Sequence, residues 1–236
     1  MSDSKLVVDA RHLTKTYKQG KLEVNALRGV SLEVTSGEFV VLAGPSGSGK
    51  TTLLNLIGAL DKPTSGELFV DGSNLETMSR AELATLRRDR VGFVFQAYNL
   101  LPVLTALENT ELVLMLRGIS ASERRERAAQ MLSVVGLSTM MDRRPNELSG
   151  GQQQRVAVAR AIAAAPSLIL ADEPTANLDS KTAESLMDLL SELNTKRGMT
   201  FLFSSHDPRV IGRAKRIVYL EDGQITSDGE AVRRGA

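Results

Sequence analysis

The chain of 236 residues has no cysteine, no excess of either charge and no long hydrophobic run. Without cysteine there is no disulfide, no thiolate metal site and no cysteine nucleophile, which fits a reducing compartment. Lys and Arg number 29 against 28 Asp and Glu, so we expect no nucleic-acid partner, because such proteins usually carry a basic face. Since no apolar run approaches the about 20 residues of a spanning helix, we expect neither a membrane span nor a signal sequence.

The apolar residues, 42% of the chain, are sufficient for a sizeable core. They occur as short β-rich runs separated by stretches with helical periodicity, which is typical of a parallel sheet flanked by helices. The predicted strands are residues 39–43, 91–95, 168–171 and 200–203, followed by a terminal hairpin of 217–220 and 224–225. One helix is predicted at 51–60, and three more begin at possible capping boxes at Ser79, Thr105 and Ser120. The helix that begins at Ser120 is predicted to end near Gly136. A further helix is predicted from Asp179 to about Lys196.

The remaining segments suggest two additions to this sheet. Short strand-like pieces at 6–13, 24–27 and 31–34 predict an antiparallel subdomain, and the charged, helical stretch 74–144 predicts an inserted helical lobe. We therefore expect an α/β fold with a mostly parallel core, organised as one domain, 1–236. Its predicted parts are the core with the β-subdomain at about 1–95 and 160–228, a helical subdomain at about 96–159, and a loose tail at 229–236.

A glycine-rich loop gives the strongest local signal. Residues 44–51 match G-x-x-x-x-G-K-[ST] and stand between a predicted strand and a predicted helix. In such a loop the backbone N–H groups and the helix N-terminus hold phosphate oxygens, Lys50 pairs with the β- and γ-phosphates, and the Thr51 hydroxyl holds magnesium. The residues predicted to bind the nucleoside triphosphate here are Gly44, Pro45, Ser46, Gly47, Ser48, Gly49, Lys50, Thr51 and Thr52.

Polar side chains follow three of the predicted strands. Asp172 and Glu173 end one apolar strand, where Asp172 can hold the magnesium ion and Glu173 can act as general base on the attacking water. His206 follows another strand and suits a γ-phosphate contact, and Gln96 has an amide within reach of metal or water. Two acids can also be a solvated strand end, and a lone histidine, such as His12, is usually structural. The phosphate loop favours the functional interpretation for Asp172 and Glu173, because it needs a magnesium-binding acid.

The pentapeptide Leu148–Gln152, with the phosphate loop and the acid pair, resembles the ATP-binding cassette (ABC) family of P-loop NTPases. The resemblance covers about residues 6–228. All of the family's landmarks occur in order: Tyr17, the loop 44–51, Gln96, the signature Leu148-Ser149-Gly150-Gly151-Gln152, Asp172-Glu173, Asn177-Leu178-Asp179 and His206.

The resemblance implies specific roles. Tyr17 stacks on adenine, Gln96 senses magnesium and a transmembrane partner, Glu173 is the general base, His206 holds the γ-phosphate, and Asp179 links two sites across a dimer. Such a chain binds ATP and Mg²⁺ and hydrolyses the ATP.

The signature has a physical explanation as well. Ser149 can cap a helix whose free N–H groups and positive dipole end face an anion, and Gly150 and Gly151 allow close backbone approach. In the family this surface completes the ATP site of the opposite subunit, so the resemblance implies a homodimer with two ATP molecules in its seam.

Residues 53–66, 92–102, 105–109 and 147–155 look like the branch of lipoprotein-releasing and macrolide-exporting proteins. The branch implies a permease partner with a periplasmic domain, at the cytoplasmic face of the inner membrane. The chain departs from this branch at 111–114, where relatives usually have a proline, which leaves the transported substrate open.

The main alternative function is a regulatory ATPase that signals through a membrane partner, as in cell-division complexes. A soluble ATPase for DNA maintenance or translation fits less well, because this chain has one signature and no sustained heptads.

Overall fold

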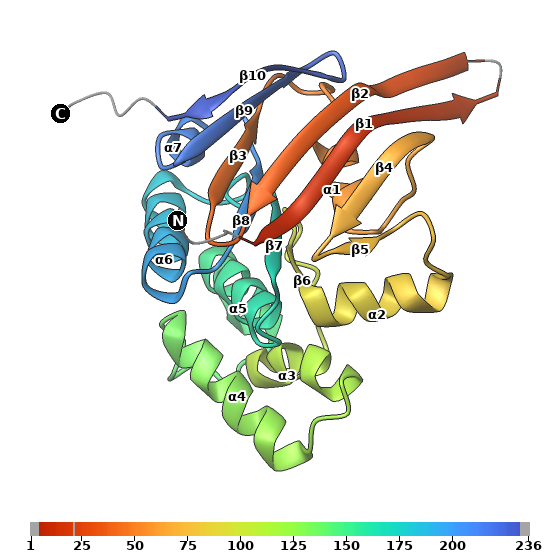
Figure 1. The fold of residues 1–236 in the computed structure, drawn as a ribbon. Helices are drawn as coiled ribbons and strands as arrows, with labels where there is room; N and C mark the ends of the chain where they lie inside the picture. The colour runs from red at the N-terminus through yellow and green to blue at the C-terminus, as the bar shows by residue number, and fades with distance from the viewer. Residues whose placement is uncertain (1–4, 21, 232–236) are drawn as a thin grey trace.

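A six-stranded sheet forms the centre of the computed structural model, which describes residues 5–20 and 22–231 (Figure 1). Its order is β10-β9-β3-β8-β7-β6, and only β10 runs antiparallel to its neighbour. The strands are β3 (Phe39–Ala43), β6 (Val91–Val94), β7 (Leu168–Asp172), β8 (Phe201–Ser204), β9 (Arg216–Glu221) and β10 (Gln224–Glu230). The predicted strands of the core are thus confirmed, although β10 extends five residues beyond its predicted end and into the segment expected to be a loose tail.

A second, antiparallel sheet has the order β2-β1-β4-β5. It consists of β1 (Leu6–Gln19), β2 (Leu22–Thr35), β4 (Ser65–Val70) and β5 (Ser73–Asn74). The antiparallel subdomain is confirmed, but the short pieces predicted for it are wrong in length. The two strands β1 and β2 pair over 14 residues each, because register shifts absorb local irregularities such as His12, whose φ is 50°. The sequence analysis did not predict β4 and β5.

The helices are α1 (Lys50–Ile57), α2 (Arg80–Arg90), α3 (Ala106–Leu116), α4 (Ala121–Val134), α5 (Gly150–Ile162), α6 (Ser180–Arg197) and α7 (Pro208–Ile211), with a 3₁₀ turn η1 (Pro145–Glu147). The capping boxes at Ser79 and Thr105 and the cap at Asp179 are confirmed. At Ser120 only half of the predicted box forms: its side chain accepts from the Glu123 N–H. Helix α1 ends at Ile57, before the predicted Leu60, because Ala59 has a left-handed φ of 54°.

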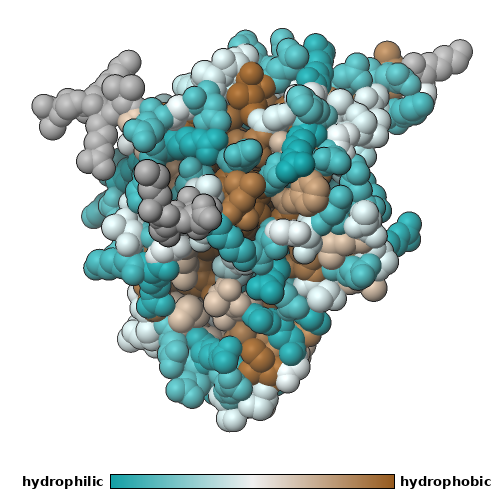
Figure 2. Space-filling view, viewed as in Figure 1, coloured by the Kyte–Doolittle hydropathy of each residue, from teal (hydrophilic) through white to brown (hydrophobic). Residues whose placement is uncertain are grey.

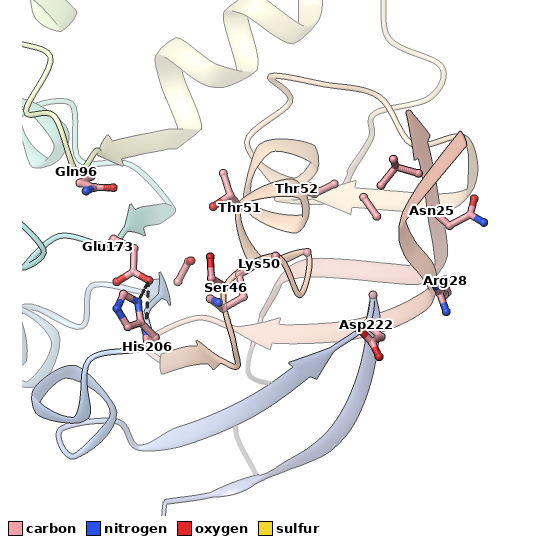
Figure 3. A pocket seen from close by; sticks show the side chains of 16 residues that line it. Asn25, Arg28, Ser46, Lys50, Thr51, Thr52, Gln96, Glu173, His206 and Asp222 are labelled. Atoms are coloured by element: carbon pink, nitrogen blue, oxygen red, sulfur yellow. Dashed lines mark hydrogen bonds and ion pairs between the residues drawn. The ribbon is translucent and has the colours of Figure 1, made fainter. Parts of the chain in front are cut away.

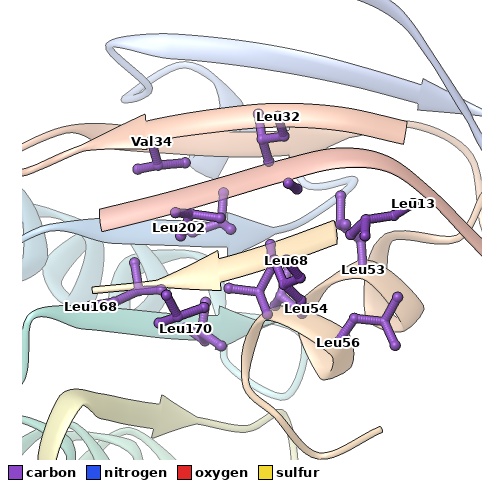
Figure 4. Close-up of a cluster of buried hydrophobic side chains, with 14 of the residues drawn as sticks. Leu13, Leu32, Val34, Leu53, Leu54, Leu56, Leu68, Leu168, Leu170 and Leu202 are labelled. Carbon is purple, nitrogen blue, oxygen red and sulfur yellow. The ribbon is translucent and has the colours of Figure 1, made fainter. Parts of the chain in front are cut away.

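The alternation of side chains along β3 produces two cores, one on each face of the parallel sheet. Val40 and Leu42 pack on the face toward α1 and the antiparallel sheet, where leucines of several elements meet (Figure 4). Phe39 and Val41 pack on the other face, against α5 and α6, and the ring centre of Phe39 lies 4.5 Å from that of Phe203. This burial on both faces explains why the strands are continuous apolar runs.

Helices α3, α4 and α5 gather at the end of the molecule away from the β1–β2 hairpin (Figure 1). The visible face of the molecule is mostly hydrophilic, with small separate hydrophobic patches (Figure 2). Within 5–20 and 22–231, no helix combines the length and the apolar character that crossing a bilayer demands.

Candidate nucleotide site

A cavity of about 540 Å³ opens at the carboxyl ends of the parallel strands (Figure 3). This is the edge at which ligands bind in open α/β sheets. Of the predicted site residues, the cavity is lined by Ser46, Gly47, Gly49, Lys50, Thr51, Thr52, Gln96, Glu173 and His206. Four separate parts of the chain that were predicted to form the site (46–52, Gln96, Glu173 and His206) therefore meet at this cavity.

The phosphate loop owes its shape to glycine. Gly44, Gly47 and Gly49 have φ values of 144°, 80° and 105°, which residues with a Cβ rarely adopt. At Gly44 a Cβ would also overlap the carbonyl oxygen of Leu220, and at Gly49 it would lie 2.5 Å from that of Ala26. The loop therefore leads straight into α1, whose N-terminus faces the cavity.

We expect Gly44→Ala to destabilise the fold by about 2 kcal/mol or more, because strain and overlap with a backbone atom add together. Gly47→Ala is the matched control, since a Cβ there has nothing within 4 Å and only the left-handed backbone costs about 1 kcal/mol. Urea unfolding of the two variants measures the difference. Equal losses would show that the contact with Leu220 does not shape the loop.

Lys50 supplies positive charge within the loop. Its side chain is buried and its ammonium donates to the carbonyl oxygens of Gly44 and Pro45, each at 2.8 Å. Burial lowers the pKa of Lys50, while the charges of Glu173 and Asp172 oppose that shift. The buried Ser48 hydroxyl has no partner among the described residues. A cation, the helix N-terminus and an unpartnered hydroxyl in one loop are suited to an anion such as phosphate.

Thr51 and Asp172 are brought together, as a shared metal site requires. The Thr51 hydroxyl donates to Asp172 Oδ1 at 3.2 Å, which joins the start of α1 to the end of β7. Within the described ranges, no three His, Asp or Glu side chains group to form a metal site. One hydroxyl and one carboxylate, completed by phosphate oxygens and water, are the kind of donor set that suits Mg²⁺.

Glu173 and His206 lie in contact (Figure 3). His206 Nδ1 is 2.6 Å from Glu173 Oε1, and the His206 backbone N–H donates to the same oxygen at 3.2 Å. Glu173 has a φ of 45°, an uncommon conformation for a non-glycine residue that often marks a functional site. Gln96 lines the same cavity, and its backbone carbonyl oxygen accepts from Asn177 Nδ2 at 2.9 Å.

The signature lies elsewhere. Among the described residues that line the cavity, none comes from Leu148–Gln152. Ser149 caps α5 by accepting from the Gln152 N–H, and the Gln152 side chain accepts from the Ser149 N–H at 2.9 Å. Asp179, also outside the cavity, accepts from the backbone N–H and the hydroxyl of Thr182, and a Cβ at Gly151 would overlap the Thr182 side chain. The signature and Asp179 thus share a surface apart from the cavity.

Tyr17 is not placed among the lining residues either. Its hydroxyl donates to Asp61 Oδ2 at 2.9 Å, and the ammonium of Lys15 lies 4.8 Å from the centre of its ring. Burial and the hydrogen bond to Asp61 raise the pKa of Tyr17. A cation therefore covers one face of the Tyr17 ring, so an adenine base would have to stack on the opposite face.

The sequence analysis missed a group of lining residues at the end of the cavity away from Glu173. Six of them come from β2 and the β9–β10 turn: Val24, Asn25, Ala26, Arg28, Asp222 and Gly223. A seventh missed lining residue, Ser204, lies at the other end, where its carbonyl accepts from the Glu173 N–H at 2.9 Å. Gly223 joins the β9–β10 turn to the phosphate loop, because its N–H donates to the Ser48 carbonyl at 3.0 Å. The predicted hairpin at Asp222 was a usable signal, since β9 runs parallel to β3 and ends at the same edge.

The edge of the sheet is arranged to hold a polyphosphate beside an acid and a histidine, which defines the chain as a P-loop nucleoside triphosphatase. Comparison with known families narrows this class. The family model described as ABC transporter matches residues 27–176, so the chain belongs to the ABC transporter family, as one of its ATPase cassettes. The recognition from the signature, the α/β fold class and the assignment as an ATPase are confirmed.

The relatives include both separate and fused cassettes. The chain is 49% identical to an uncharacterised ABC transporter ATP-binding protein of Methanocaldococcus jannaschii (93% of this chain, 95% of the relative), and 49% identical to the lipoprotein-releasing system ATP-binding protein LolD of Anaeromyxobacter dehalogenans (97% and 96%). It is 47% identical to the macrolide export ATP-binding/permease protein MacB of Hyphomonas neptunium, but spans only 34% of that protein against 94% of its own length.

Solved structures of ABC cassettes resemble this chain as well. The chain matches a dimeric post-hydrolysis state of the ATP-binding cassette MJ0796 bound to ADP and Pi, with a TM-score of 0.87, 48% identity, and coverage of 97% of this chain and 100% of the other. A second dimeric structure of that cassette matches with a TM-score of 0.88.

Proposed function

We propose that this chain binds and hydrolyses ATP as one half of a homodimer that closes around two ATP molecules and drives a membrane permease. The observation that carries this proposal is the separation of the signature from the cavity of its own chain. A capped helix N-terminus with free N–H groups is an anion site, so it can meet the γ-phosphate held by a second copy. The dimeric cassette structures, one of them with ADP and Pi, support this arrangement.

Within one site, Lys50 and the loop hold the phosphates, and Thr51, Asp172 and Gln96 hold Mg²⁺. A bound Mg²⁺ ion would neutralise the negative charge that develops on the phosphates. Glu173 takes the proton of the attacking water.

Three further residues have roles in nucleotide contact and in coupling the two sites. His206 contacts the γ-phosphate, the face of the Tyr17 ring opposite Lys15 stacks on adenine, and Asp179 connects the two sites across the dimer. All three carry the polar or aromatic groups that these contacts need.

ATP would then act as the link between two copies, because its γ-phosphate contacts the loop of one and the signature of the other. Hydrolysis removes that link and reopens the seam, so the chemical step is coupled to subunit separation. A permease attached to the two copies would convert this closing and opening into movement. The LolD and MacB relatives favour an exporter, or a complex that moves a periplasmic domain, and a position at the cytoplasmic face of the inner membrane.

A groove suits the contact with the permease. It is a hollow of about 440 Å³ between the core and the helical subdomain proposed at 96–159, and apolar side chains of Leu60, Phe93, Val113 and Leu116 line it. Leu116 is 64% exposed, and an exposed apolar groove is typical of a helix-binding surface. Half-buried Arg160 of α5 donates to the carbonyls of Tyr98 and Asn99 beside it, which connects the groove to the signature helix.

Leu116→Asp tests this contact. A carboxylate in the apolar groove should weaken permease binding by about 2 kcal/mol or more, about 30-fold in affinity. Tagged chain purified from membranes should then retain far less permease than the matched control Leu22→Asp, which alters a 71% exposed leucine on the distant β1–β2 hairpin. Thermal unfolding confirms that both variants fold. Equal retention would contradict the groove as the docking site, and recovery of a cell-division partner without a transporter would favour a regulatory function.

A further inference from the structure

The hydroxyl of Ser205 lies directly behind the proposed general base. Ser205 Oγ donates to Glu173 Oε2 at 3.0 Å, whereas the backbone N–H and ring of His206 contact the other oxygen, Oε1. The two oxygens of the Glu173 carboxylate therefore have separate partners. Ser205 does not line the nucleotide cavity and is fully buried.

The surroundings of Ser205 fix the direction of its proton. Its oxygen accepts from the backbone N–H of Asp207 at 3.1 Å, so the hydroxyl hydrogen is left to donate to Glu173. The Asp207 carboxylate in turn accepts from the Thr175 hydroxyl at 3.0 Å and from Arg209. The Ser205 N–H donates to the Leu42 carbonyl at 3.0 Å, which fixes this residue to β3. These hydrogen bonds together connect β3, the turn after β7 and the turn after β8.

We propose that Ser205 is a positioning residue that keeps the Glu173 carboxylate oriented when His206 turns to the nucleotide. The inference rests on the proposed role of Glu173 as the base. His206 is 69% exposed at its side chain and lies at the cavity, so its ring can leave Oε1 for a γ-phosphate. That movement leaves only the His206 backbone N–H at Oε1 and opens this oxygen to accept a proton from water, while the buried hydroxyl of Ser205 still holds Oε2. Without this anchor the carboxylate would rotate about its terminal torsion, which is soft.

Ser205→Ala tests this role. We expect kcat for ATP to fall about tenfold, the effect of one hydrogen bond to a charged group, while KM for ATP stays within about twofold. Ser205→Thr, which keeps the hydroxyl, should restore kcat. The matched control is Ser167→Ala, because Ser167 also donates to a carboxylate at 3.0 Å, that of Asp71, outside the cavity. Thermal unfolding of both alanine variants separates a loss of stability from a loss of rate.

The outcomes are distinguishable. A kcat for Ser205→Ala equal to that of the wild type, or a loss that Thr does not restore, would overturn the positioning role. If Glu173→Gln itself still hydrolysed ATP at the wild-type rate, the proposed base would be wrong, whatever Ser205→Ala did. A parallel fall of kcat in Ser167→Ala would assign the effect to stability and would also overturn the proposal.

Discussion

Glu173→Gln should lower steady-state ATP hydrolysis by about 10²- to 10⁴-fold, the contribution of a general base. The amide cannot take a proton from water, but it has nearly the shape of the carboxylate, so nucleotide binding should persist. Because ATP then stays intact in the seam, the variant should accumulate as an ATP-bound dimer. Phosphate release measures the first effect, and size-exclusion chromatography with ATP and Mg²⁺ measures the second.

Glu192→Gln is the matched control for this prediction. Glu192 is an acid on α6 that pairs with Lys196, and the same substitution there should leave both the rate and the monomer–dimer distribution unchanged. Wild-type hydrolysis by Glu173→Gln would remove Glu173 as the base. A loss of hydrolysis without any trapped dimer would instead contradict the idea that unhydrolysed ATP holds two copies together.

The sequence predicts those parts of the site that are local in the chain. The phosphate loop is one continuous segment, and Asp172 and Glu173 follow directly on an apolar strand, so their residue types and spacing carry the information. Placement of His206 and Gln96 at the same edge followed from the direction of parallel strands. The cavity brings all of these segments together, while the individual roles of these residues remain proposals.

Residues that depend on strand order could not be predicted in this way. Asp222 reaches the cavity only because β9 lies beside β3, and Ser205 faces Glu173 only because β8 lies beside β7. Arg28 of β2 is held at the same place by its backbone N–H, which donates to the Gly223 carbonyl at 2.8 Å. A pattern of alternating apolar runs does not determine that order. The length of β1 and β2 was also underestimated, because paired strands with register shifts tolerate polar residues that interrupt a simple alternation.

The structure also determines which variant can test the signature. A side chain at Gly151 would overlap Thr182 of the same chain, and one at Gly150 would lie 2.9 Å from the Tyr98 hydroxyl. Substitutions at either glycine would therefore disturb the monomer as well as any dimer. Ser149→Ala is little better, since Ser149 caps α5 and removing such a cap costs about 1 kcal/mol.

Ser149→Asp avoids these difficulties. Aspartate caps a helix about as well as serine, so α5 and the monomer should keep their stability. In the proposed dimer, however, its carboxylate would face the γ-phosphate held by the other copy. Like charges brought together at an interface cost several kcal/mol, so we expect ATP-dependent dimerisation and hydrolysis to fall about 100-fold or more.

Three measurements check this prediction. Thermal unfolding and binding of a fluorescent ATP analogue to the monomer should match the wild type, whereas sedimentation in the Glu173→Gln background should show no ATP-bound dimer. Ser149→Asn keeps the cap without the charge, and it should dimerise better than Ser149→Asp. If Ser149→Asp weakened nucleotide binding to the isolated monomer as much as it weakened hydrolysis, the signature would act within its own chain. Because the signature lies outside its own cavity, we expect the charge to act only when a second copy supplies the phosphate.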